Sequence, residues 1–363
     1  MLTRRALLAA AAAFPLGVSA RAGLLRPAID EDASLRDLAA SHGLLYGCAV
    51  AGYELEQPDF NAALLREAAL LVAEYEMKRN AIEPAPGRYA FGPADTLVDF
   101  ARDRGLKFRG HPLVWHRSNP GWLEGAVRSS RKEDLFTGHI ARMIGRYRGR
   151  VQSWDVVNEI LAPEDGRADN LRNSFWLETF GPSYIDTAFH AARAADPHAQ
   201  LVYNDWGCEL AGPEHDRFRA ATLNFLEGAK ARGVPIDALG LQGHLRAYGE
   251  PVDQAKLRGF LHAVQALGLR ILVTEHDVAD DGGPADAAMR DAAVAEASAR
   301  FLDVVVANPA IDAVLTWGLS DRFLGAPGLR ARLLGMTPRM LPLDRELQRK
   351  PLWRAMARAF SSR

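Results

Sequence analysis

Short apolar segments alternate with longer segments of helical periodicity along nearly the whole chain. Eight stretches are typical of buried strands, at residues 44–50, 70–78, 107–115, 151–158, 199–205, 238–244, 270–277 and 313–319. Apolar spacings of three and four predict helices at residues 32–41, 93–104, 133–147, 175–195, 214–232, 253–267 and 285–307. This alternation favours an α/β fold with a single (β/α)8 TIM barrel over residues 23–363, rather than a doubly wound sheet.

Composition excludes several classes of partner. The 363 residues are 48% hydrophobic, enough for one large core or two modest ones, and their formal net charge of −1 shows no basic excess for nucleic acid. The cysteines and histidines lack the spacing of a metal site, and the sequence has no glycine-rich phosphate loop. We therefore expect a neutral substrate, no metal and no nucleic-acid partner. We also expect a monomer.

The first 22 residues have the pattern of an export signal. Arg4 and Arg5 precede an alanine-rich apolar run that is too short to span a bilayer, and small residues follow near Ala22. The arginine pair favours a twin-arginine signal, with a general secretory signal as the alternative. We expect a bacterial protein that is exported to the periplasm or secreted, without a membrane anchor after cleavage near Ala22 or Gly23.

The chain has two cysteines, Cys48 and Cys208, so at most one disulfide can form. Cys48 lies inside the apolar stretch 44–50, where a buried free thiol is favoured over a bridge. A bond between the two cysteines stays open as the alternative.

Polar and aromatic residues collect at the predicted C-terminal ends of the strands, where barrels of this kind hold their active sites. They are Glu74, Lys78, His111, Trp115, Asn158, Glu159, Asn204, Gln242, His244, Glu275, Asp277 and Trp317. Each alone could be a capped or solvated loop position, but the group as a whole indicates a site. Aromatic faces pack on sugar C–H surfaces, and amides, histidines and lysines bind hydroxyls. The set predicts a site for a neutral polyhydroxylated ligand.

Two of these residues, Glu159 and Glu275, form a candidate catalytic pair. Two carboxyl groups about 5 Å apart cleave a glycosidic bond, one as general acid and the other as nucleophile. Strand alternation puts Glu275 and Asp277 on one face, so His244 on an adjacent strand can lie between them and orient Glu275. That suits a nucleophile and leaves Glu159 as the acid, then the base. Asn158 is placed to bind the sugar 2-hydroxyl.

Several ordered motifs resemble those of the family-10 glycoside hydrolases, the endo-β-1,4-xylanases. The motifs are Arg109-Gly110-His111, Trp115-His116, Trp154-Asp155-Val156-Val157-Asn158-Glu159, Gly240-Leu241-Gln242-Gly243-His244 and Thr274-Glu275-His276-Asp277. The resemblance extends from residue 47 to residue 351. It implies a retaining mechanism, no cofactor, and xylan or xylo-oligosaccharides as substrate.

By motif match, the resemblance also assigns roles. Glu159 looks like the acid/base and Glu275 like the nucleophile. Gln242 and His244 look like the residues that support this pair. The expected glycone-side contacts are Lys78, His111, Trp115, Asn158 and Trp317.

The chain departs from the family pattern mainly on the glycone side. Tyr75 replaces an amide residue, Ser118 replaces a glutamine, and Gly325 stands where a second tryptophan is usual. A lost stacking or hydrogen-bonding group costs on the order of 1–3 kcal/mol of binding. These changes predict a weaker or altered xylanase. His276 replaces a leucine, and alternation directs it away from the site.

Two local features give further expectations. Pro112 follows His111 where the family tends to hold a strained cis bond, so we expect a cis His111–Pro112 bond, which proline makes less costly. Trp206 follows the strand at 199–205 and either stacks on the leaving-group sugar or packs on the rim of the barrel.

Two functional alternatives remain at this point. The first is a barrel hydrolase of altered specificity, acting on another β-1,4-glycan, a decorated xylan or an aryl glycoside. The second is a sugar-binding protein without activity, which would have no reason to keep Glu159, Glu275 and His244 together.

Overall fold

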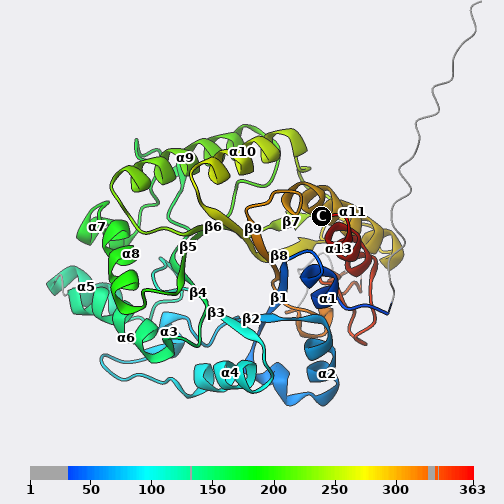
Figure 1. Cartoon of the computed structure of the whole chain (residues 1–363), viewed down its shortest axis with the longest axis horizontal. Helices are drawn as coiled ribbons and strands as arrows, with labels where there is room; N and C mark the ends of the chain where they lie inside the picture. Colours follow the sequence, from blue (N-terminus) through cyan, green and yellow to red (C-terminus); the bar gives the residue numbers. More distant parts are fainter. Residues whose placement is uncertain (1–31, 131–132, 326–331, 334) are drawn as a thin grey trace, which may run out of the picture.

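Eight parallel strands close into a barrel in the computed structural model, which describes residues 32–130, 133–325, 332–333 and 335–363 (Figure 1). The barrel strands are β1 (Leu45–Val50), β2 (Leu70–Ala73), β3 (Lys107–Gly110), β4 (Ser153–Asn158), β5 (Gln200–Asp205), β6 (Ala238–Leu241), β8 (Arg270–Ala279) and β9 (Ile311–Thr316). Strand β1 pairs with both β2 and β9, and β6 pairs with β8, which closes the ring. The expected (β/α)8 barrel is confirmed.

Helices surround the barrel on its outside (Figure 1). They are α1 (Leu35–Ala40), α2 (Pro58–Glu67), α3 (Arg79–Ile82), α4 (Gly92–Asp103), α5 (Leu123–Ser130), α6 (Thr137–Tyr147), α7 (Phe175–Phe180), α8 (Tyr184–Ala195), α9 (Pro213–Ala231), α10 (Gln254–Ala266), α11 (Ala287–Val305) and α13 (Pro351–Ser361). The short 3-10 turns are η1 (Gly52–Glu56), η2 (Glu133–Leu135), η3 (Pro163–Asp165) and η4 (Asp321–Phe323). The main apolar core lies between these helices and the strands, because each helix turns its apolar stripe inward.

Small and branched side chains fill the inside of the barrel. They are Ala49, Leu70, Val72, Val202, Ala238, Leu272, Ala313 and Leu315. Such a packed interior is a core rather than a pore, and barrels of this kind hold their active sites at the C-terminal ends of the strands.

Four predicted strands end three or more residues early in the structure, and the helix predicted over 175–195 is divided. The strand expected over 238–244 stops at Leu241, because Gly243 adopts a left-handed conformation with φ of 76°, and the chain resumes as β7 (His244–Arg246). The helix expected over 175–195 is two helices, since Gly181 has a φ of 72° and Pro182 cannot continue a helix.

The other three strands, expected over 70–78, 107–115 and 313–319, end early at Ala73, Gly110 and Thr316. Apolar residues beyond these ends, such as Met77 and Val114, are buried in loops over the barrel. Their burial extends the apolar pattern past the true end of the strand.

The expectation of a cis His111–Pro112 bond is wrong, because this bond is trans. After Pro112 the chain continues alongside β4, where the Leu113 and Val114 amides donate to the carbonyls of Asp155 and Val156 at 2.9 and 3.1 Å. A trans bond, which X–Pro pairs prefer, keeps the chain extended along this path.

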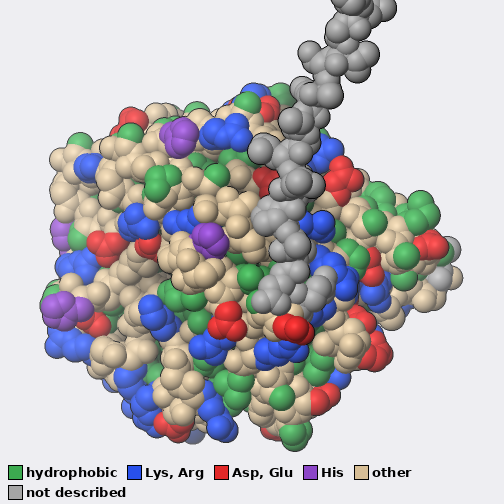
Figure 2. Space-filling view, turned by 45° about the vertical axis from the view of Figure 1, so that its right-hand side comes forward, with side chains coloured by type: hydrophobic (Ala, Val, Ile, Leu, Met, Phe, Trp, Pro, Cys, Tyr) green, Lys and Arg blue, Asp and Glu red, His purple; other side chains and the backbone are tan. Residues whose placement is uncertain are grey.

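Both cysteines are free thiols and both are buried, so the disulfide alternative is wrong. Burial raises the pKa of Cys48 and of Cys208 and keeps both thiols protonated. Among the described residues, no helix is both long and apolar enough to cross a membrane. The predicted signal segment, residues 1–22, lies outside the described residues. Acidic and basic side chains are interspersed on the face drawn in Figure 2.

Candidate active site

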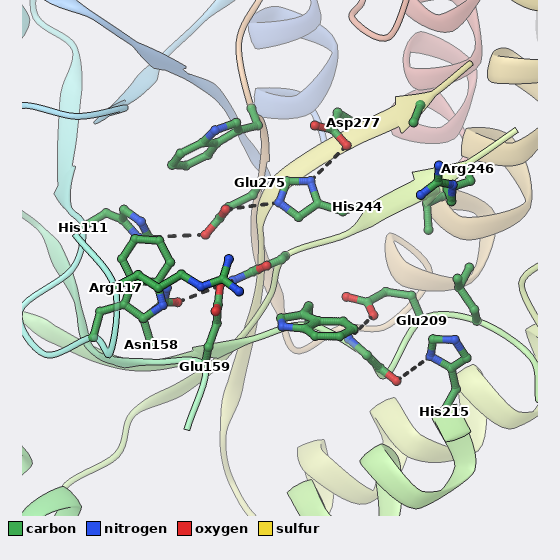
Figure 3. A pocket seen from close by; sticks show the side chains of 18 of the residues that line it. His111, Arg117, Asn158, Glu159, Glu209, His215, His244, Arg246, Glu275 and Asp277 are labelled. Atoms are coloured by element: carbon green, nitrogen blue, oxygen red, sulfur yellow. Dashed lines mark hydrogen bonds and ion pairs between the residues drawn. The ribbon is translucent and has the colours of Figure 1, made fainter. Parts of the chain in front are cut away.

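A cleft of about 580 Å³ opens at the C-terminal ends of the barrel strands (Figure 3). The predicted site residues that line it are Lys78, His111, Trp115, Asn158, Glu159, Gln242, His244, Glu275, Asp277 and Trp317. Asn204 lies directly behind the cleft, where it contacts Asn158 and Glu275. Glu74 does not line the cleft, but its charge favours the protonated form of Lys78, which does.

Glu275, on β8, is held by neighbours on both oxygens. Its Oε1 accepts a 2.8 Å hydrogen bond from Asn204 Nδ2, and its Oε2 lies 3.2 Å from His244 Nε2. Burial by itself would raise the pKa of Glu275. The hydrogen bond from His244 and the electrostatic influence of His111 and His244 outweigh burial and lower this pKa to about 2. Glu275 is therefore an oriented, ionised carboxylate.

His244 bridges two carboxylates of β8, as the alternation of the strand predicted. Its Nδ1 lies 2.9 Å from Asp277 Oδ1, on the side of the ring opposite Glu275. Burial opposes a charge on the ring, but Asp277 and Glu275 together raise the pKa of His244 well above its usual value. The protonated ring can donate to both carboxylates at once. The turn at Gly243 places the ring there, because it moves β7 out of the barrel wall to pair with β8 alone.

Asn204, on β5, connects the two carboxylate-bearing strands. Its Oδ1 accepts a 2.6 Å hydrogen bond from the Thr274 hydroxyl, which leaves the amide nitrogen to donate to Glu275 and to Asn158 Oδ1 at 2.9 Å. Space for this amide exists because residue 240 is glycine. A Cβ at Gly240 would lie 2.3 Å from Asn204 Oδ1.

A buried ion pair fixes His111 beneath the cleft. Asp155 accepts from Arg109 Nη2 at 2.5 Å and lies 2.8 Å from His111 Nδ1. Arg109 and Asp155 are fully buried, so water cannot compete for the hydrogen bonds between them. Sequence reasoning gave these two residues no role, although a charged residue within an apolar strand is itself a signal of a paired buried charge.

Glu159 directly follows β4 and has a left-handed backbone with φ of 54°. Its carboxylate has weaker partners than that of Glu275: Oε1 accepts from Gln242 Nε2 at 3.2 Å, and Oε2 lies 3.9 Å from His116 Nε2. Burial, together with the charges of Arg172 and Arg117, lowers the pKa of His116 to about 4. The neighbour of Glu159 is therefore a neutral imidazole.

Gln242 contacts both halves of the carboxylate pair. Its carbonyl accepts from the amide of Glu275 at 3.0 Å, while its side chain donates to Glu159. The two carboxylates therefore lie in one cleft, as the sequence predicted. Their separation of about 5 Å stays a prediction from the chemistry of such pairs.

Aromatic rings form the wall of the cleft beside Glu275. The ammonium group of Lys78 lies 5.5 Å from the ring of Trp115 and 5.6 Å from that of Trp317. His111 packs edge-on against Trp317 at 5.3 Å. On another side, Trp206 lines the cleft and packs on Phe218 at 5.3 Å. Its stacking on the leaving-group sugar stays a prediction.

The departures at Tyr75, Ser118 and Gly325 fall outside the lining of this cleft. Tyr75 is 50% exposed, and its hydroxyl accepts from Asn80. His276 is buried and points away from the cleft as expected, with Nδ1 2.8 Å from the Gly243 carbonyl and Nε2 2.8 Å from the Ser298 hydroxyl.

Sequence reasoning missed several residues that line the cleft, namely Arg117, Arg172, Glu209, His215 and Arg246. Most lie in loops or turns beyond the strand ends, where neither alternation nor helical spacing gives a signal. Glu209 shows what such a residue does: its carboxylate accepts from the amides of Gly207 and Gly243 at 2.8 and 3.1 Å. It thereby supports the turn that carries His244. In the described part of the chain, no group of histidine, cysteine and acidic residues is arranged to hold a metal ion.

Comparison with known proteins relates this chain to a family. The model of glycosyl hydrolase family 10 matches residues 34–359. Endo-1,4-beta-xylanase B of Thermotoga neapolitana is 33% identical over 305 residues, which are 82% of this chain and 84% of that protein. Xylanase 10B of Thermotoga maritima superposes with a TM-score of 0.80 at 30% identity, over 91% of this chain and 98% of that one.

A structure of xylanase 10B from Thermotoga petrophila in complex with xylobiose also superposes with a TM-score of 0.80, at 30% identity over 92% of this chain and 98% of that one. The match of the family model spans nearly all of the described residues, and the fold and the cleft agree with it. The chain belongs to glycosyl hydrolase family 10.

Proposed function

We propose that the protein is a retaining endo-β-1,4-xylanase that cleaves internal bonds of xylan, with Glu275 as nucleophile and Glu159 as acid/base. One observation carries this proposal: two carboxylates share a cleft but have opposite surroundings. Glu275 is bonded on both oxygens and held ionised, whereas Glu159 has one amide donor and a neutral imidazole nearby. Similar proteins named as xylanases, one of them in complex with xylobiose, support the choice of substrate.

The first chemical step forms a covalent intermediate. A carboxylate oxygen of Glu275 attacks the anomeric carbon while the bond from that carbon to the glycosidic oxygen breaks. Glu159 donates its proton to the departing oxygen, so the leaving sugar departs as a neutral hydroxyl. The products of this step are a glycosyl ester on Glu275 and an ionised Glu159.

The second step reverses these roles. Glu159 takes a proton from a water molecule, whose oxygen attacks the anomeric carbon as the ester bond to Glu275 breaks. Glu275 leaves as a carboxylate, which His244 and Asn204 stabilise by hydrogen bonds. Two inversions give net retention of the anomeric configuration.

The anomer formed first tests this mechanism. Proton NMR during hydrolysis of xylo-oligosaccharides should show the β-anomer first, with mutarotation to the α-anomer later. Release of reducing sugar from xylan, cellulose and mannan, measured beside a Glu275→Ala variant, tests the substrate. Inverted products would overturn the mechanism, and binding of xylan without turnover would favour a sugar-binding protein.

A hydrolase of altered specificity is a second candidate because of the glycone-side departures. Tyr75 is exposed and does not line the cleft, so it does not replace the expected amide contact there. The products from xylotetraose, xylopentaose and xylohexaose report how many glycone subsites bind sugar. Cleavage that does not accelerate with chain length beyond the shortest substrate would support this candidate.

A further inference from the structure

Two arginines line the cleft on the side of Glu159 without neutralising a carboxylate. Arg172 donates from Nε to the carbonyl of Glu159 and from Nη2 to the carbonyl of Leu161, both at 2.9 Å. These bonds fix the guanidinium group in place. Since both acceptors are neutral backbone groups, its positive charge remains available to the cleft.

Arg117 supplies a second positive charge at the same place. Its side chain is exposed, lines the cleft, and makes no hydrogen bond or ion pair within the part of the chain that the structure describes. Figure 3 shows it directed into the cleft beside Asn158 and Glu159. An arginine that is not engaged with the protein is available to a ligand.

The charges of Arg117 and Arg172 both reach His116, which lies beside Glu159. After burial, the charges of Arg172 and Arg117 are the largest influences on its pKa, and both lower it. Within the part of the chain that the structure describes, the carboxylates that line the cleft make no ion pair with either arginine. Glu275 and Asp277 bond His244, and Glu209 bonds two backbone amides.

We propose that Arg117 and Arg172 bind a carboxylate carried by a side group of the substrate, so that the enzyme prefers xylan decorated with uronic acid. An undecorated xylan chain is neutral, so it offers hydroxyl acceptors but no opposite charge to two guanidinium groups. A guanidinium group, by contrast, binds a carboxylate through paired, charge-assisted hydrogen bonds. This inference rests on the proposed xylanase function and specifies its substrate.

Three xylo-oligosaccharides of equal length test the inference: one undecorated, one with a single uronic acid, and one with the methyl ester of that uronic acid. The wild-type kcat/KM should be highest on the free acid. The ester keeps the size of the side group and removes its charge, so it should lose the preference.

The matched variants are Arg117→Gln, Arg117→Lys and Arg258→Gln. Arg117→Gln should lower the ratio of kcat/KM on the acidic substrate to that on the neutral one by about 10-fold. Arg117→Lys should keep part of the ratio because it keeps the charge. Arg258 is exposed on α10, away from the cleft, and Arg258→Gln removes the same charge and should leave the ratio unchanged.

The outcomes separate this inference from the proposed function. Failure to cleave any of the three substrates would overturn the xylanase proposal. If the enzyme cleaves the neutral substrate and the acidic substrate with equal kcat/KM, the inference alone is overturned. The same holds if kcat/KM is equally high on the acid and on its methyl ester. An unchanged ratio in Arg117→Gln would also overturn it.

Discussion

The surroundings of Glu275 and of Glu159 differ in how many hydrogen bonds hold each carboxylate. Glu275 is bonded by an amide and an imidazole, and the pKa of the imidazole is itself raised by Asp277. Glu159 adopts a left-handed backbone and has one amide donor at 3.2 Å. The residues around Glu275 thus form a network, while those around Glu159 form a looser group.

The difference follows from what each carboxyl group has to do in the proposed mechanism. The nucleophile is an anion before the first step and again after the second, so fixed donors stabilise it in both of these states. An acid/base must give up a proton and take one back, and strong fixed donors would hold it in one state. The following predictions test this contrast, from the largest expected effect to the smallest.

Replacing Glu275 should have the largest effect. Glu275→Ala removes the attacking group, and kcat on xylo-oligosaccharides should fall by about 10⁴-fold or more. Added azide should then attack the anomeric carbon from the side vacated by the Glu275 carboxylate and give an α-glycosyl azide, which NMR identifies. A β-azide from this variant would contradict the assignment of Glu275.

Replacing Glu159 should depend on the leaving group. Glu159→Ala should lower kcat on xylan by about 10²–10⁴-fold, because the departing oxygen receives no proton. An aryl glycoside with an acidic phenol needs no proton, so its first step should be nearly preserved and should show a burst of phenol. With azide, the product should be the β-glycosyl azide. Equal losses of activity on xylan and on the aryl glycoside would contradict the assignment of Glu159 as the acid/base.

Replacing His244 should weaken the network around Glu275 and leave the group around Glu159 intact. His244→Gln removes the main influence that lowers the pKa of Glu275. The pKa of Glu275 should then rise from about 2, so that as the pH falls Glu275 becomes protonated, and thus inactive, at a higher pH than in the wild type. The acid limb of the kcat/KM profile should therefore move upward, and kcat should fall about 10- to 100-fold. An unchanged acid limb would show that His244 does not control the pKa of Glu275.

Replacing His276 should mainly change stability. His276→Leu leaves the Gly243 carbonyl and the Ser298 hydroxyl buried without their partner, which costs about 1–3 kcal/mol of unfolding free energy. Urea denaturation measures this loss, and Ser298→Ala is the control that removes one of the two bonds. Activity should fall only a few-fold, since the ring does not reach the cleft. An equally stable variant would contradict a supporting role for His276.

Most of the fold could be read from the sequence because its signals are local. Apolar strands and amphipathic helices repeat in order, and their order defines the barrel. The errors lie where local signals mislead. Buried Met77 and Val114 extend two apolar runs into loops, and the glycine at residue 243 gives no sign of its left-handed backbone until the chain is folded.

The sequence alone determined the barrel and the two glutamates, because a carboxylate at the end of a buried strand is visible in the strand itself. Only the tertiary structure decided which glutamate receives the donors. Asn204 and His244 are 71 and 31 positions from Glu275, and Arg172 is 13 positions beyond Glu159. The charge state of Glu275 depends on these contacts through space. No pattern along the chain records them, since they form only when the strands close into a ring.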